Sequence, residues 1–117
     1  MPLIKIATNV KGDSIDQEAF LKQAGVAFQE TIDKPMSKVL VQLQLDQLMS
    51  FGGTTEPCAM IDVLSAGKIS KEENMKYTKA LTELMAKINV PQNRMYVIFV
   101  DLPRDNIGVK NTVLSEL

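Results

Sequence analysis

The chain has 117 residues, a net charge of −1, one cysteine and no histidine. This length predicts one domain over residues 1–117, and 45% apolar with 23% charged residues is typical of a soluble globular protein. Without a block of like charge, nucleic-acid and membrane-surface binding are not expected, and without His or a Cys cluster a zinc site is not expected. Apolar runs too short for a bilayer and the lack of a signal-peptide pattern favour the cytoplasm.

The first half of the chain predicts a strand, a helix and a second strand. Residues 3–8 form an apolar strand, and Ser14 with Gln17 has the pattern of a capping box at a helix start. Pro35 cannot continue a helix, and alternating apolar residues over 39–45 predict a strand with one more polar face. The apolar stripe expected on this helix consists of Leu21, Ala24, Phe28 and Ile32.

The second half repeats this order of elements. Residues 59–66 predict a strand, and Ser70 with Glu73 gives a second capping box. Pro91 ends the helix, and the unbroken apolar run 95–100 predicts a strand buried on both faces. The apolar stripe expected on this helix consists of Tyr77, Leu81, Leu84, Met85 and Ile88. After residue 103 the tail is irregular, with short edge strands as an option.

The two halves are related by an offset of 56 residues, which predicts pseudo-repeat units at about 2–46 and 58–102. The matching pairs are Ser14 and Ser70, Phe28 and Leu84, Ile32 and Ile88, Pro35 and Pro91, and Val39 and Met95. Right-handed βαβ crossovers make the two strands of each unit parallel. We therefore predict an α/β (α+β) fold in which two βαβ repeats form a four-stranded mixed sheet with two helices on one face. The other face is too apolar for water, so we expect subunits to cover it.

A proline directly follows the initiator methionine. Removal of Met1 would leave Pro2 with a secondary amine, and a terminal amine has a pKa of about 7.7–8. In a chain without histidine, this amine is the main candidate for a base near neutral pH. The simpler alternative is that Pro2 only marks a start site that cannot donate a backbone hydrogen bond.

Several segments together resemble the macrophage migration inhibitory factor and D-dopachrome tautomerase family, in one register over nearly the whole chain. The segments are Met1-Pro2, Lys34-Pro35, the run from Asp46 to Ala59, Ser65-Ala66-Gly67 and Asn93-Arg94-Met95-Tyr96. In the tail, Ile107-Gly108, Thr112-Val113 and Leu117 are more similar to the D-dopachrome tautomerase branch.

This resemblance implies a homotrimer that interconverts keto and enol forms of phenylpyruvate-like or dopachrome-like compounds without a cofactor. It implies Pro2 as the catalytic base, Lys34 as the partner of the substrate carboxylate, and the backbone of Ala66 as a further substrate contact. Tyr96 would line the site of a neighbouring subunit, so each site would lie between subunits. The resemblance also implies cytokine-like signalling through a cell-surface receptor, with secretion that needs no signal peptide. A non-enzymatic ligand built on the same trimer is the alternative.

Four positions bear on how closely the chain would follow this family. Ile98 stands at a substrate-contact position that is commonly polar, and Val109 replaces an aromatic residue at the pocket mouth, which removes stacking area. Asp33 replaces a glycine and would compete with substrate for Lys34. Lys38 is either a second partner for a carboxylate or an ordinary surface lysine. We therefore expect activity with an altered or weakened substrate preference.

Overall fold

The computed structural model describes residues 1–117, the whole chain. The elements of its main layer are β1 (Pro2–Thr8), α1 (Gln17–Ile32), β2 (Leu40–Gln44), β3 (Ala59–Ser65), α2 (Lys71–Ala86) and β4 (Met95–Asp101). A separate hairpin follows, formed by β5 (Gly108–Val109) and β6 (Thr112–Val113). Neither α1 nor α2 combines the length and apolar character that crossing a membrane requires.

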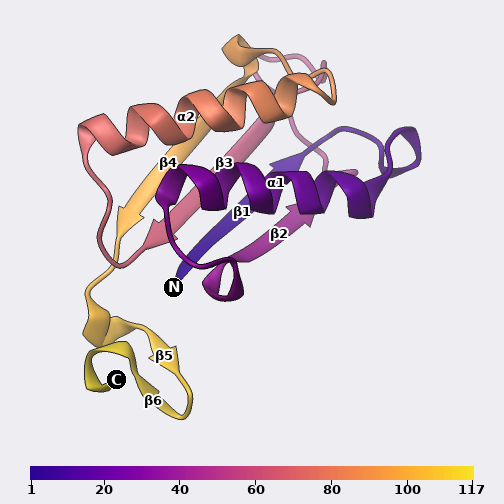
Figure 1. Ribbon diagram of the computed structural model, residues 1–117. Helices are drawn as coiled ribbons and strands as arrows, with labels where there is room; N and C mark the ends of the chain where they lie inside the picture. The colour runs from indigo at the N-terminus through magenta and orange to yellow at the C-terminus, as the bar shows by residue number, and fades with distance from the viewer.

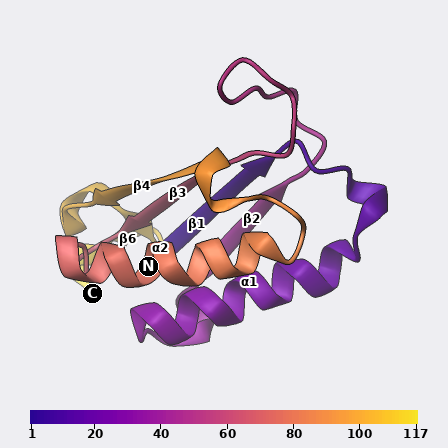
Figure 2. The same ribbon diagram turned by 90° about the horizontal axis from the view of Figure 1, so that it is seen from above.

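The main sheet has the order β2-β1-β3-β4. β1 is parallel to β2, β3 is parallel to β4, and the two central strands β1 and β3 are antiparallel. Both helices pack on the same face of this sheet (Figures 1 and 2) and contact each other. The predicted arrangement of two βαβ repeats in one mixed sheet is confirmed.

The core lies between the sheet and the two helices. Alternate residues of the central strands point into it, because successive side chains of a strand face opposite sides. The helices contribute stripes at helical spacing, and all five residues expected on α2 are buried. The largest fully buried core side chains include Phe28, Ile4, Ile6, Ile61 and Met85.

The start of α1 differs from the prediction. Asp16, not Ser14, is the N-cap, and its carboxylate accepts a hydrogen bond from the Ala19 amide at 3.1 Å. The Ser14 hydroxyl instead donates to the Lys11 carbonyl within the preceding turn. The predicted cap of α2 is confirmed, because the Ser70 hydroxyl accepts from the Glu73 amide at 3.2 Å.

The apolar stripe of α1 is also shifted from the prediction at its first turn. Phe20 is buried there at 4% exposure, whereas Leu21 is 36% exposed. The later members, Ala24, Phe28 and Ile32, are buried as expected. Since Phe20 lies four residues before Ala24, it continues the same helical face, and Leu21 lies on the flank of that face.

The sheet face opposite the helices is uncovered in the single chain. Strand β4 was expected to be buried on both faces, but Tyr96 is 68% exposed and Ile98 is 52% exposed. Leu40 on β2 and Met60 on β3 are exposed on the same face, which follows from the strand register. The long apolar run of β4 therefore has one face in the core and one unpartnered face.

The tail does not extend the main sheet. Strands β5 and β6 pair only with each other, and the hairpin projects beyond the end of the sheet where β1 begins (Figure 1). Its two-residue turn, Lys110-Asn111, has φ of 50° and 65°. Positive φ at both central positions is the geometry of a type I′ turn, whose twist matches that of the flanking strands.

Candidate active site at the start of strand β1

Pro2 is fully buried at the first position of β1. It is paired in register with Ser65, the last residue of the antiparallel strand β3. Its side chain faces the helices because it continues the buried alternation of Ile4 and Ile6. While Met1 is attached, the Pro2 nitrogen is part of a peptide bond.

Lys34 reaches this strand end from the far end of α1. The helix ends at Ile32, and Asp33 adopts a left-handed conformation with φ of 55°, which turns the chain back toward β1. The Lys34 ammonium donates three hydrogen bonds, to the Met1 carbonyl at 3.0 Å, the Ser65 hydroxyl at 3.1 Å and the Ala66 carbonyl at 3.1 Å. All three N–H donors of this lysine are therefore occupied beside the Pro2 peptide bond.

The electrostatics of this region disfavour positive charge. The pKa of the Met1 α-amine is lowered, first by burial and then by the charges of Lys34, Lys38 and Arg104. The pKa of Lys34 is lowered by burial and by Lys68 and Arg104, with Asp101 acting in the opposite direction. An amine placed here loses its proton more readily than a free terminal amine.

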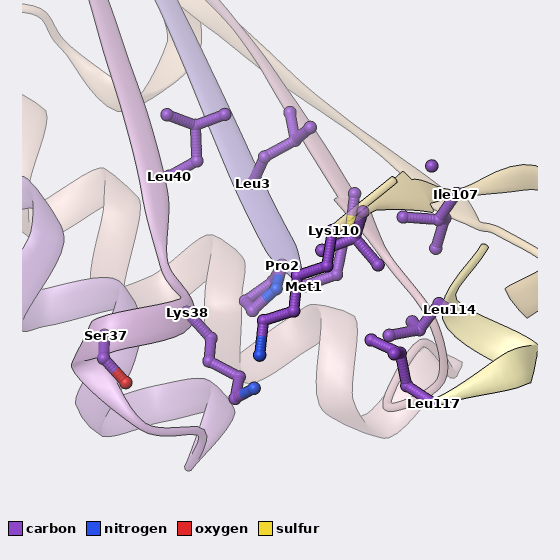
Figure 3. A pocket seen from close by; sticks show the side chains of 12 residues that line it. Met1, Pro2, Leu3, Ser37, Lys38, Leu40, Ile107, Lys110, Leu114 and Leu117 are labelled. Carbon is purple, nitrogen blue, oxygen red and sulfur yellow. The ribbon is translucent and has the colours of Figure 1, made fainter. Parts of the chain in front are cut away.

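A cavity of about 340 Å³ opens beside Pro2 (Figure 3). It lies between the start of β1, the segment that leads into β2, and the C-terminal hairpin. The lining residues are Met1, Pro2, Leu3, Ser37, Lys38, Leu40, Ile107, Gly108, Val109, Lys110, Leu114 and Leu117. The hairpin wall is held by hydrogen bonds from the Leu114 amide to the Ile107 carbonyl and from Arg104 to the Leu114 carbonyl.

The structure brings together four of the six predicted site residues. Pro2 and Lys38 line the cavity, and Lys34 donates hydrogen bonds to the Met1 carbonyl, next to Pro2, and to the Ala66 carbonyl. Tyr96 and Ile98 lie elsewhere on the same chain.

Tyr96 is in register with Met60, and Met60 with Ala7, five positions along β1 from Pro2. Five residues of strand span roughly 17 Å. Tyr96 instead packs against Phe51, with ring centroids 5.2 Å apart. Ile98 is in register with Asp62 and lies halfway along the edge strand β4, on the uncovered face.

Two polar residues of this region were not expected from the sequence. Ser65 has no exposed surface and accepts a hydrogen bond from Lys34. Its signal in the sequence was a hydroxyl at the end of a strand whose one other polar residue is Asp62. Lys110 lines the cavity from the tip of the hairpin. Val109, expected at the pocket mouth, does line the cavity. No group of three or more Cys, Asp and Glu side chains is arranged to hold a metal ion.

Comparison with known proteins gives a consistent result. The sequence profile of the family described as macrophage migration inhibitory factor (MIF) matches residues 1–115. The chain is 37% identical to the macrophage migration inhibitory factor of Xenopus laevis over 109 residues, 92% of this chain and 94% of the relative. It is 36% identical over 116 residues to the homolog of Brugia malayi, 98% of this chain and 100% of the relative.

The chain belongs to the macrophage migration inhibitory factor family. Solved structures agree with this assignment. The factor from Trichinella spiralis superimposes with a TM-score of 0.88 at 32% identity, covering 95% of this chain and 98% of the other. The factor from Toxoplasma gondii gives a TM-score of 0.85 at 30% identity, with the same coverages.

Members of this family are known as cytokines and as tautomerases. Family membership therefore supports tautomerase or isomerase activity in general for this chain. It also fits a small-molecule substrate and self-association.

Proposed function

We propose that this chain, once Met1 is removed, is a cofactor-free keto–enol tautomerase that acts on phenylpyruvate-like or dopachrome-like substrates. The observation that carries the proposal is the 3.0 Å hydrogen bond from the Lys34 ammonium to the Met1 carbonyl. That carbonyl belongs to the peptide bond made by the Pro2 nitrogen. Removal of Met1 turns this nitrogen into an amine and frees one Lys34 donor beside it.

The two groups then have complementary tasks. The neutral Pro2 amine removes a proton from the carbon next to the substrate carbonyl, and the C–H electron pair enters the new carbon–carbon double bond. The carbonyl oxygen becomes the enol oxygen and takes up a proton from solvent, while the Pro2 ammonium releases its proton to solvent and so becomes a neutral amine again. The reverse sequence regenerates the keto form. Lys34 binds the substrate carboxylate and stabilises the charge that develops on the enolate.

The lowered pKa of the terminal amine supports this assignment of the base. Burial and the neighbouring cations that lower the pKa of the Met1 amine act at the same strand end as the Pro2 nitrogen. A general base works best when its pKa lies close to the working pH. An amine whose pKa lies near the working pH is neutral in about half of the molecules, so it can accept a proton from the substrate.

We further propose that the working unit is a homotrimer with sites between subunits. The uncovered apolar sheet face requires a partner surface, and Tyr96 is 68% exposed and remote from the Pro2 of its own chain. A neighbouring subunit can supply Tyr96 and Ile98 to the cavity beside Pro2. Ala66 would contribute backbone contacts, and Lys38 a second cation near the substrate.

Cytokine-like signalling through a cell-surface receptor is proposed as a second role of the same assembly, because the family is known for it. The cell would then hold the protein in the cytoplasm and release part of it without a signal peptide. A ligand without enzymatic activity remains the alternative. The Pro2→Gly variant separates signalling from tautomerase activity, because it removes the proposed base. Receptor binding that survives Pro2→Gly is independent of the tautomerase site.

The test begins with intact mass spectrometry, which establishes that Met1 is absent. The processed chain and Pro2→Gly are then compared for exchange of phenylpyruvate between keto and enol forms. We expect the variant to lose activity, and kcat/KM of the parent to rise with pH as the Pro2 amine loses its proton. Equal rates for variant and parent would remove Pro2 from the mechanism.

A further inference from the structure

The cavity beside Pro2 has two kinds of lining that tautomerase chemistry does not by itself require. Its apolar wall is aliphatic, and no aromatic side chain of this chain contributes to it. The charged side chains of its lining are all basic: Lys38 and Lys110 line it, and no acidic side chain does. The apolar residues are Met1, Pro2, Leu3, Leu40, Ile107, Val109, Leu114 and Leu117.

The two lysines reach the cavity from unrelated parts of the chain. Lys38 ends the short 3-10 turn after Pro35, and Lys110 lies in the turn of the C-terminal hairpin. Both are exposed, and in Figure 3 their side chains extend toward each other across the space in front of Pro2. Two ammonium groups that converge without an acidic side chain between them form a site for an anion.

The backbone of Lys110 strengthens this interpretation. Its φ of 50° lies in the left-handed region, which lysine rarely adopts and which Asn or Gly would occupy at lower cost. The type I′ turn nevertheless places lysine at this position and so fixes its place on the cavity wall. Unfavourable backbone conformations of this kind concentrate at functional positions.

We propose that this site prefers 2-keto acids that carry a second carboxylate over monocarboxylates of the same chain length. The inference rests on the proposed function and defines its substrate class. Lys34 binds the carboxylate next to the keto group, and Lys38 with Lys110 binds the distal carboxylate. The aliphatic wall contacts the methylene groups between them, and the volume of about 340 Å³ lies near the lower end of the usual range for ligand pockets.

A matched pair of compounds tests this preference. 2-Oxoglutarate and 2-oxopentanoate have the same five-carbon chain, the same keto group and the same C3 methylene, and differ only in the terminal carboxylate. In D₂O each catalytic cycle breaks one C3–H bond and forms one C3–D bond, with the deuteron taken from solvent, and proton NMR follows the loss of the C3 signal. We expect kcat/KM for 2-oxoglutarate to be higher by about tenfold or more, because charge-assisted hydrogen bonds are the stronger kind.

Two variants then connect the preference to the lysines. Lys38→Gln removes one charge, and Lys110→Asn removes the other while placing a residue that tolerates the left-handed turn. Each is expected to lower kcat/KM for 2-oxoglutarate several-fold more than that for 2-oxopentanoate, mainly through KM. Lys76→Gln, an equal loss of charge on the exposed side of α2, is the control and should change neither substrate.

The outcomes separate this inference from the proposed function. If the parent exchanges both compounds equally, or if Lys38→Gln and Lys110→Asn leave the ratio unchanged, the second carboxylate is not recognised and the inference is overturned. That result leaves exchange by Pro2 intact. If Pro2→Gly exchanges both compounds as fast as the parent, the proposed function itself fails. A ratio that falls only in the two cavity variants supports the inference.

Discussion

The two βαβ repeats use nearly the same backbone for different purposes. Asp33 and Asn89, 56 positions apart, both adopt left-handed conformations, with φ of 55° and 67°. Each is followed two residues later by a proline, Pro35 or Pro91, and then by one turn of 3-10 helix. The offset seen in the sequence therefore corresponds to a repeated helix exit.

The side chains placed on this repeated exit differ. Lys34 extends to the Pro2 strand end, whereas its counterpart Val90 is buried in the core at 1% exposure. Lys38 lines the cavity, whereas its counterpart Arg94 donates hydrogen bonds to the loop between β2 and β3. One copy of the exit builds a charged site and the other stabilises the fold, so side-chain chemistry rather than backbone shape distinguishes them.

The comparison predicts its largest effect at Lys34. Lys34→Val places the second repeat's residue in the first repeat and removes the proposed partner of the substrate carboxylate. We expect kcat/KM for phenylpyruvate exchange to fall about 100-fold, the usual cost of losing one such donor. Lys76→Val, on an exposed helix position, is the control and should retain parent activity. If kcat/KM of Lys34→Val is within threefold of the parent value, the two helix exits do not differ in function.

The reciprocal change concerns stability. Arg94 donates to the carbonyls of Phe51, Thr54, Glu56 and Pro57, and its guanidinium lies 5.6 Å from the Phe51 ring centroid. Lysine cannot reproduce this planar set of donors, so Arg94→Lys should lower the free energy of unfolding by about 2 kcal/mol. Urea denaturation measures this change in the free energy of unfolding. Lys38→Arg should change the free energy of unfolding by less than about 0.5 kcal/mol. Equal effects of the two variants would contradict the conclusion that Arg94 stabilises the fold and Lys38 does not.

Tyr77 in α2 corresponds to Leu21 in α1, and the pair differs in burial. The Tyr77 hydroxyl donates to the Lys68 carbonyl, and burial followed by the Glu73 charge raises its pKa to about 12. Tyr77→Phe should lower the free energy of unfolding by about 1.5 kcal/mol.

The raised pKa also predicts a pH dependence. The phenol ionises near 10.0 in the unfolded chain but near 12 in the fold, so its stabilisation is present below pH 10 and is lost between pH 10 and 12. Denaturation series at pH 9, 10 and 11 should show a steeper loss for the parent than for Tyr77→Phe. Parallel pH profiles would rule out this contribution.

The smallest effects are expected at the helix starts. Asp16→Ala and Ser70→Ala each remove a cap and should lower the free energy of unfolding by about 1 kcal/mol. Ser14→Ala, at the position that the repeat offset equates with Ser70, should have less effect because its hydroxyl serves only the preceding turn. Thermal denaturation compares the three. A larger loss of stability for Ser14→Ala than for Asp16→Ala would indicate that Ser14, the residue matched to Ser70 by the 56-residue offset, caps α1.

The sequence predicted the order of elements because periodicity and proline positions are local signals. The prediction of Ser14 as the cap of α1 was wrong, because Asp16 is an equally good capping residue and the choice depends on where the turn from Lys11 closes. The sequence could not predict Lys110 in the cavity, because the wall combines segments more than 60 residues apart. Pro2 was identified as a candidate base from its place behind Met1 in a chain without histidine, whereas Lys34, Ala66 and Lys38 were located through the family resemblance. The roles of all four stay predictions.

The antiparallel contact between β1 and β3 has a consequence for the origin of the chain. Two identical half-chains related by a two-fold axis perpendicular to the sheet would meet through their first strands in this antiparallel orientation. Joining their ends by the loop that Arg94 now holds would convert such a symmetric dimer into the present covalent pair. Fusion releases the halves from having to be identical, so one could acquire a reactive lysine while the other kept valine.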